Sequence, residues 1–253
     1  MSGIVRVVGQ SVGPGRIIKA SKDSVISLIP DGDAMSFTAI SIASVVPEMM
    51  LKNLTAGWGV ASLECVAHSA PGALPMAQIA VCDGELVRTS QHAKLVSVKS
   101  GTVQDDNKEP DYIGASAHTN NTGELTAIYE ALATALRRPR DAGGEVIWSD
   151  SLYAINMTNG KWKPKCVRNR EIVSRLRGLW RRLQRARPGD VQLRHVRSHV
   201  KVPGNELADW LADGGQARAH PTLREAERWL ADWIDTQQRA ALRAQRQGGG
   251  GDG

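Results

Sequence analysis

The order of apolar and polar positions divides the chain into two parts with different predicted secondary structure. Up to residue 117 the apolar residues come in short runs that Gly, Pro and Asp interrupt, and the first 50 residues show no helical periodicity of any length. This pattern predicts a β-rich first part made of short strands. We place these strands at residues 4–8, 25–29, 37–46, 57–65, 78–81, 94–98 and 112–117.

From residue 122 the apolar positions recur with helical spacing. Leu125, Ile128 and Leu132 share one face of a predicted helix, which Pro139 closes. The order of the predicted elements, a series of strands followed by strands that alternate with helices, indicates a mixed sheet flanked by helices. The later strands are expected at residues 146–148 and 191–196, and the later helices at 151–157, within 161–187, at 206–211 and at 221–247.

Composition narrows the class of protein. The chain has 253 residues, of which 42% are hydrophobic and 23% charged, as in an ordinary globular protein with one core and some additions. It has no run of 18 apolar residues, so we expect no membrane span. Three widely separated cysteines without a C-x-x-C pair indicate neither a disulfide framework nor a structural zinc site.

A reducing, intracellular location fits this cysteine usage, either cytoplasmic or nuclear. The first 22 residues are basic and contain no acid, which is a weak signal for import into an organelle. The Gly13-Pro14-Gly15 sequence argues against the amphipathic helix that such a transit segment needs.

The positive charge is concentrated in one segment. The net charge is +6, but residues 161–187 contain eleven Lys and Arg against the single acid Glu171, so this segment alone carries +10. A solvated helix face is one reading, because apolar residues at helical spacing would dock its other side. Arg177 and Arg181 repel each other at i, i+4, however, and an anionic ligand would offset that cost. A polyanion is the expected partner.

Three acidic residues stand where the predicted secondary structure changes. Glu124 lies in TNNTGELTAIYEAL, Asp150 in EVIWSDSLYAINM, and Asp209 in HVRSHVKVPGNELADWLAD, ten residues after His199. Each acid also has a structural reading. Glu124 could complete a capping box with Asn121, Asp150 could cap the helix that follows it, and Asp209 would favour the first turn of a helix that Asn205 caps.

Together the three segments resemble a ribonuclease H of type 1. The resemblance implies an α/β fold, with a ribonuclease H-like mixed five-stranded sheet flanked by helices, an N-terminal β-rich extension and a C-terminal helix. On this basis we divide the chain into an extension, a domain and a tail. These are residues 1–35, residues 36–216 with an insertion at 66–104, and residues 217–253, a C-terminal helix with a disordered Gly-rich tail.

The resemblance also implies an activity. Members of this family cleave the RNA strand of RNA/DNA hybrids by two-metal hydrolysis with Mg²⁺, for which Mn²⁺ can substitute. By resemblance Glu124, Asp150 and Asp209 would bind metal and act in catalysis, with His199 as a proton shuttle or an aid to product release. The expected substrate contacts are Asn120, Asn121, Ser151, Lys161, Trp162, Lys163, Lys165, Arg168 and Asn205.

The chain departs from the family pattern at the first strand, which usually carries a fourth acid. Residues 37–41 resemble that strand, with Ala39 at the position of the acid and Asp33 further back. A rival alignment places Asp83 at the position of this acid, where it would be a metal ligand. Loss of the acid that bridges both metals would cost several kcal/mol of transition-state stabilisation.

Two further readings follow from this departure. The chain could be a ribonuclease H-like binding module that is impaired in catalysis, or a domain from a mobile element. No protein partner can be inferred from the sequence.

Overall fold

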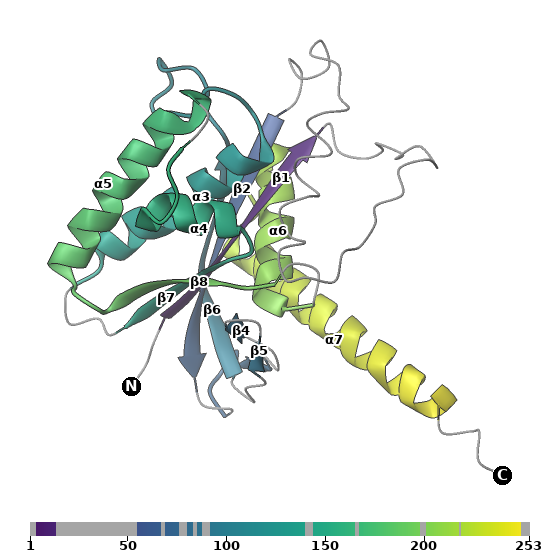
Figure 1. Cartoon of the computed structure of the whole chain (residues 1–253). Helices are drawn as coiled ribbons and strands as arrows, with labels where there is room; N and C mark the ends of the chain where they lie inside the picture. Colours follow the sequence, from purple (N-terminus) through teal and green to yellow (C-terminus); the bar gives the residue numbers. More distant parts are fainter. Residues whose placement is uncertain are drawn as a thin grey trace.

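The computed structural model describes most of the chain from residue 55 onward and one strand before it (Figure 1). The described residues are 4–13, 55–66, 69–75, 80–82, 85–87, 92–139, 144–164, 167–197, 201–217 and 219–248.

A six-stranded mixed sheet forms the centre of the fold. Its strand order is β3-β6-β2-β1-β7-β8, and β4 and β5 form a separate two-stranded ladder. β1 pairs antiparallel with β2 and parallel with β7, and β7 pairs parallel with β8. The strands are β1 (Ile4–Gly13), β2 (Thr55–Val66), β3 (Leu74–Pro75), β4 (Ala80–Cys82), β5 (Glu85–Val87), β6 (His92–Thr102), β7 (Glu145–Ser149) and β8 (Val191–His195).

Helices cover both faces of this sheet, and each face has its own apolar core. One core joins β2 and β7 to α3, α4 and α5, and the other joins β2 and β6 to α6 and α7. A short 3-10 helix, Val167–Asn169, precedes α5. The α-helices are α3 (Asn120–Arg137), α4 (Leu152–Asn159), α5 (Arg170–Ala186), α6 (Pro203–Gln216) and α7 (Leu223–Gly248).

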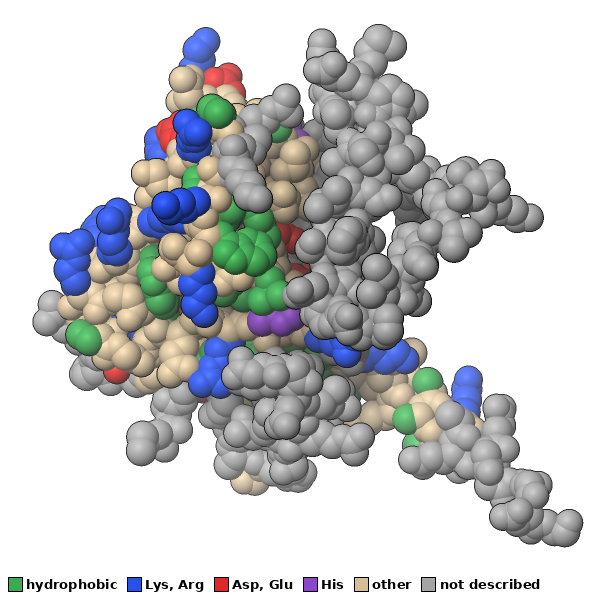
Figure 2. Space-filling model, viewed as in Figure 1, with side chains coloured by type: hydrophobic (Ala, Val, Ile, Leu, Met, Phe, Trp, Pro, Cys, Tyr) green, Lys and Arg blue, Asp and Glu red, His purple; other side chains and the backbone are tan. Residues whose placement is uncertain are grey.

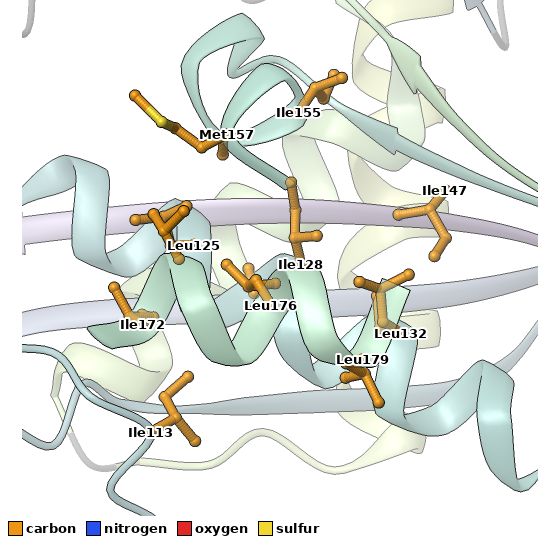
Figure 3. Packing of buried hydrophobic residues seen from close by; sticks show 14 of the residues in the cluster. Ile113, Leu125, Ile128, Leu132, Ile147, Ile155, Met157, Ile172, Leu176 and Leu179 are labelled. Atoms are coloured by element: carbon orange, nitrogen blue, oxygen red, sulfur yellow. The ribbon is translucent and has the colours of Figure 1, made fainter. Parts of the chain in front are cut away.

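The first core shows why the helical spacing in the sequence was informative. Leu125, Ile128 and Leu132 of α3 point toward the apolar face of α5, where Leu176 is fully buried (Figure 3). Burial of each such side chain contributes about 1.5 to 3 kcal/mol. The helices predicted from this spacing are therefore confirmed. α5 packs on α3 and α4, and this layer covers one face of the sheet.

The second core ends in a row of three stacked indole rings. Trp210 of α6 stacks on Trp229 of α7 with ring centroids 5.2 Å apart, and Trp229 stacks on Trp233 at 6.4 Å. Together with the buried Leu230 and Ile234, these rings fix the first half of α7 on α6. No helix in the described residues has the length and hydropathy needed to cross a bilayer.

Three sequence predictions about the sheet are corrected. The sheet has six strands instead of five, because the two-residue β3 pairs with β6 at the edge. Ile4–Gly13 is not part of an extension, since it forms the central strand between β2 and β7. The predicted insertion contains His92–Thr102, which is a full strand of the main sheet. The rest of the predicted division into domains stays a prediction.

The predicted strand at residues 112–117 is also wrong, because this segment is a loop. Gly114 has φ +98°, and a Cβ there would lie 2.7 Å from the backbone nitrogen of Ile172. The loop therefore passes too close to the start of α5 for an extended strand with side chains. The strands predicted at residues 25–29 and 37–46 lie outside the described residues.

Candidate active site

Glu124 lies in the second turn of α3 and is not part of the helix cap. The N-cap is Thr119 instead of the predicted Asn121, and its partner in the capping box is Thr122. The Thr122 backbone N–H donates to Thr119 Oγ1 at 3.2 Å, and the Thr119 N–H donates to Thr122 Oγ1 at 2.9 Å. Glu124 is thereby left for another partner, and its Oε2 accepts a hydrogen bond from the Ser151 hydroxyl.

Asp150 stands at the carboxyl end of β7, where the neighbouring parallel strand β8 also ends. Ser151, not Asp150, caps α4, since Ser151 Oγ accepts from the Ala154 N–H at 3.1 Å. The backbone carbonyl of Asp150 lies 3.3 Å from Nε2 of His195, the last residue of β8. Asp150 is therefore not the N-cap of α4.

Asp209 lies in the second turn of α6, because this helix begins at Pro203 with Val202 as N-cap and not at the predicted Asn205. Asn205 is only 1% exposed, and its Nδ2 donates to Asp209 Oδ2 at 3.4 Å. α6 packs directly on β2 at Gly59, where a Cβ would lie 2.3 Å from the Ala208 carbonyl oxygen. This close approach fixes how far the helix that carries Asp209 stands from the sheet.

Asp150 lies close enough to Glu124 and Asp209 to raise the pKa of both. Burial raises the pKa of Glu124 to about 8, with a further increase from Asp150 and a smaller opposing effect of the Ser151 hydrogen bond. Burial also raises the pKa of Asp209 well above its usual value, and Asp150, Glu206, Asp213 and Glu124 add to this rise. Residues far apart in the sequence thus form one acidic cluster, defined here as Glu124, Asp150 and Asp209.

The strand next to Asp150 contains no acid. β1, whose sequence is IVRVVGQSVG, lies between β2 and β7. Val8 lies opposite Ser149 in the parallel ladder, so Gly9 and Gln10 follow at the level of Asp150. Ala39, Asp33 and Asp83 lie outside the described residues. No carboxylate of β1 therefore lies beside Asp150.

Comparison with known proteins identifies the family. The model of the RNase H family matches residues 78–217, more than half of the chain. The chain belongs to the ribonuclease H family. It is 34% identical over 149 residues to the ribonuclease H of Dichelobacter nodosus, covering 56% of this chain and 83% of that protein. It is 37% identical over 115 residues to the Saccharopolyspora erythraea ribonuclease H, covering 43% and 72%.

Solved structures add little to this assignment. The RNase H1 of Halobacterium salinarum aligns with 86% of this chain and 99% of its own length, at 16% identity and a TM-score of 0.43. The identification as a ribonuclease H enzyme therefore rests on the sequence matches, which confirm the resemblance seen in the three acidic segments.

The predicted substrate residues of this ribonuclease H fall into three groups. Asn120 and Asn121 are partly exposed at the start of α3, and Lys161, Trp162 and Lys163 are exposed after α4. Ser151 and Asn205 are buried, and in this structure their side chains contact Glu124 and Asp209 instead of the surface. The side chains of Lys165, Arg168 and His199 lie outside the described part of the chain.

The acidic cluster has the donor chemistry of a magnesium site. Mg²⁺ prefers hard oxygen ligands, and Glu124, Asp150 and Asp209 supply three carboxylates whose mutual repulsion a divalent cation would relieve. Within the described residues, no three Asp, Glu, His or Cys side chains lie close enough together to bind one metal ion as they stand. Ser151 holds Glu124 and Asn205 holds Asp209, so these carboxylates would have to turn toward an ion.

His195 was not among the residues predicted from the sequence, and it lies against the backbone of Asp150. Burial lowers the pKa of His195, the hydrogen bond to the Asp150 carbonyl opposes this effect, and Arg197 lowers the pKa further. The ring is therefore neutral near pH 7 and can donate Nε2–H to that carbonyl. No motif marks this residue; only the parallel pairing of β7 with β8 indicates it.

Proposed function

We propose that this ribonuclease H cleaves the RNA strand of RNA/DNA hybrids endonucleolytically, with Mg²⁺ bound by Glu124, Asp150 and Asp209. The observation that carries the proposal is the convergence of these three carboxylates from α3, the end of β7 and α6, to the point where Asp150 raises the pKa of both Glu124 and Asp209. Mn²⁺ is the expected substitute for Mg²⁺ because it accepts the same hard oxygen ligands.

The bound ions would activate a water and stabilise the leaving oxygen of the phosphodiester. The chain's own residues would orient the carboxylates and select the RNA strand. Ser151 orients Glu124, Asn205 orients Asp209, and His195 restrains the backbone at Asp150. Asn120 and Asn121 are placed at the open start of α3, where amide side chains can contact the minor groove and the 2′-hydroxyls that distinguish RNA.

The test is cleavage of a labelled hybrid in Mg²⁺ by the wild-type protein and by Asp150→Asn. We expect the cleavage rate of the variant to be at least about 100-fold lower, because the substitution removes the charge of one of the three proposed metal ligands. Glu227→Gln on the exposed side of α7 is the control, since it removes an acid on another helix that has no part in the pKa shifts of Glu124 and Asp209. Equal rates for wild type and Asp150→Asn would refute the proposal.

A second function is favoured by one observation, the absence of an acid from β1. A ribonuclease H that lacks this carboxylate can bind hybrid without turning it over. Such a protein would bind the labelled hybrid with a steep salt dependence and leave it intact in Mg²⁺ and in Mn²⁺. Cleavage that Asp150→Asn abolishes would exclude this alternative.

A further inference from the structure

The imidazole of His118 links the loop before α3 to the start of β2. Its Nδ1 accepts a hydrogen bond from the backbone N–H of Ala56 at 3.1 Å. Its Nε2 lies 3.3 Å from Oδ1 of Asp105, which stands near the other end of the same loop. A backbone N–H can only donate, so Nδ1 carries no proton and the ring proton is on Nε2. The ring is therefore held as the Nε2–H tautomer, which donates to Asp105.

The Ala56 N–H that His118 accepts lies where β6 leaves the sheet. The ladder between β2 and β6 ends at the pair Gly57 and Thr102, and the next bond is the one from the Val103 N–H to the Ala56 carbonyl at 2.7 Å. Ala56 is fully buried, so an unpaired N–H there would cost about as much as a lost hydrogen bond. The His118 ring thus supplies the acceptor that a further residue of β6 would have supplied.

His118 also lies within the hydrogen-bonded start of α3. Thr119, which follows it, is the N-cap of this helix. The hydroxyl of Thr122 donates to the carbonyl of Ala117, which precedes it, at 2.8 Å. Both chain neighbours of His118 are therefore fixed to the first turn of α3, and the ring joins this turn to the sheet.

The acidic cluster does not depend on this link in the same way. Glu124 lies further along α3, and its carboxylate is bonded to Ser151 at the start of α4. Asn120 and Asn121 are partly exposed and come directly after the N-cap. Loss of the His118 link would therefore displace these two amides before it displaced Glu124, and would affect substrate binding more than the chemical step.

The basic face of the molecule cannot supply the selection of RNA. Figure 2 shows Lys and Arg side chains gathered over α5. Contacts between such side chains and phosphates give affinity and a salt dependence, but a DNA strand carries the same phosphates. Selection of RNA needs contacts to the 2′-hydroxyl, which in the proposed function come from the amides at the start of α3.

We infer that His118 is a positioning residue for RNA selection. Together with Asp105 it holds the start of α3 on β2, and so sets where the amides of Asn120 and Asn121 lie. The bond to the Asp105 carboxylate is charge-assisted and keeps Nδ1 as the accepting side of the ring. The inference rests on the proposed function, because it takes these two amides as the groups that contact the RNA strand.

Four variants test the inference. His118→Ala removes the link, whereas His118→Asn keeps a side-chain oxygen that can accept from the Ala56 N–H. Asp105→Asn removes the charge that fixes the tautomer. The matched control is Asp106→Asn, which makes the same change at the next residue, where an amide oxygen can still accept from the Lys108 N–H as Asp106 Oδ1 does at 3.0 Å.

Two measurements are made on each variant. Cleavage of a labelled hybrid in Mg²⁺ gives kcat and KM. Fluorescence anisotropy over a range of salt, with Asp150→Asn added so that the hybrid stays intact, gives Kd for the hybrid and for a DNA duplex of the same sequence. Circular dichroism confirms that the variants are folded.

We expect His118→Ala to raise KM and the Kd of the hybrid about tenfold, since a buried donor loses its acceptor. Its kcat is expected to change by less than about twofold, because the lost contact acts on binding. The Kd of the DNA duplex and both salt slopes are expected to stay the same. His118→Asn is expected to restore most of the affinity, Asp105→Asn to lose about threefold, and Asp106→Asn to match the wild type.

Equal preference for hybrid over DNA in the wild type and in His118→Ala would overturn the inference. A lower kcat at unchanged KM would overturn it as well, because the effect would then lie at the acidic cluster. Should His118→Ala not fold, equal values for Asp105→Asn and Asp106→Asn would have the same consequence. If the wild type does not cleave the hybrid, the nuclease proposal fails, while the anisotropy comparison still tests His118.

Discussion

Glu124 is expected to destabilise the metal-free protein at alkaline pH. Its folded-state pKa is about 8, against 4.5 for the ordinary carboxyl, because it is buried and lies near Asp150. The folded state therefore binds this proton more tightly than the unfolded state does. Stability is unaffected by this group below pH 4.5, falls as pH rises from 4.5 to 8, and stays at the lower value above pH 8.

The size of the effect follows from the shift. A change from 4.5 to about 8 corresponds to roughly 5 kcal/mol at 1.36 kcal/mol per unit. The carboxyl group of Glu124 is buried, but the residue as a whole keeps some exposed surface, and solvent there screens part of the penalty, so we expect about 3 kcal/mol. Glu124→Gln removes the charge and keeps an oxygen that can accept from Ser151. This variant is expected to be about 3 kcal/mol more stable than wild type at pH 8.5 and equally stable at pH 4.5.

The assay is urea unfolding in EDTA at both pH values, followed by tryptophan fluorescence. Glu130→Gln is the control, because Glu130 is on the same helix and pairs with Lys99 on the sheet instead of facing another acid. Its stability is expected to vary with pH as the wild type does. If the difference between wild type and Glu124→Gln were the same at both pH values, the electrostatic account of the acidic cluster would be refuted. Adding Mg²⁺ is expected to stabilise the wild type more than the variant.

Two further predictions concern the scaffold around the cluster. Gly59→Ala forces a Cβ into the backbone of α6 and is expected to cost about 1 to 3 kcal/mol and to reduce cleavage by displacing Asp209, measured by urea unfolding and by kcat; unchanged values would show that α6 yields freely. Glu145 is fully buried beside Arg138 at 3.0 Å and Arg187 at 3.6 Å, so Glu145→Gln is expected to cost about 3 to 5 kcal/mol in thermal unfolding. A loss below about 1 kcal/mol would contradict this role.

The helices and the acidic segments could be predicted because their signals are local. The periodicity of α3 and α5 is complete within each helix, and Asp150-Ser151 follows directly on an apolar run. The cap of α3 could not be assigned from the sequence because Thr119, Asn120 and Asn121 can all cap a helix. The choice depends on the partner three residues later, which is Thr122 in the structure.

The central strand could not be predicted because its pairing is non-local. Ile4–Gly13 and its partner Thr55–Val66 are separated by 41 residues, and several β-branched runs compete for the same place in the sheet. A similar limit applies to the site. Resemblance predicted Asn205 as a substrate contact, which stays a prediction, but only the packing of α6 shows that it is buried and contacts Asp209.

The stacked indoles provide an optical reporter of α6, the helix that carries Asp209. Trp210 follows Asp209 directly in α6, and its ring is the first of the row that continues through Trp229 and Trp233 of α7. Rings at this separation couple electronically and contribute a shared near-ultraviolet dichroism signal. A rotation of α6 that turned the Asp209 carboxylate toward an ion would change the overlap of the first pair, so ion uptake could be followed spectroscopically without a label and without substrate.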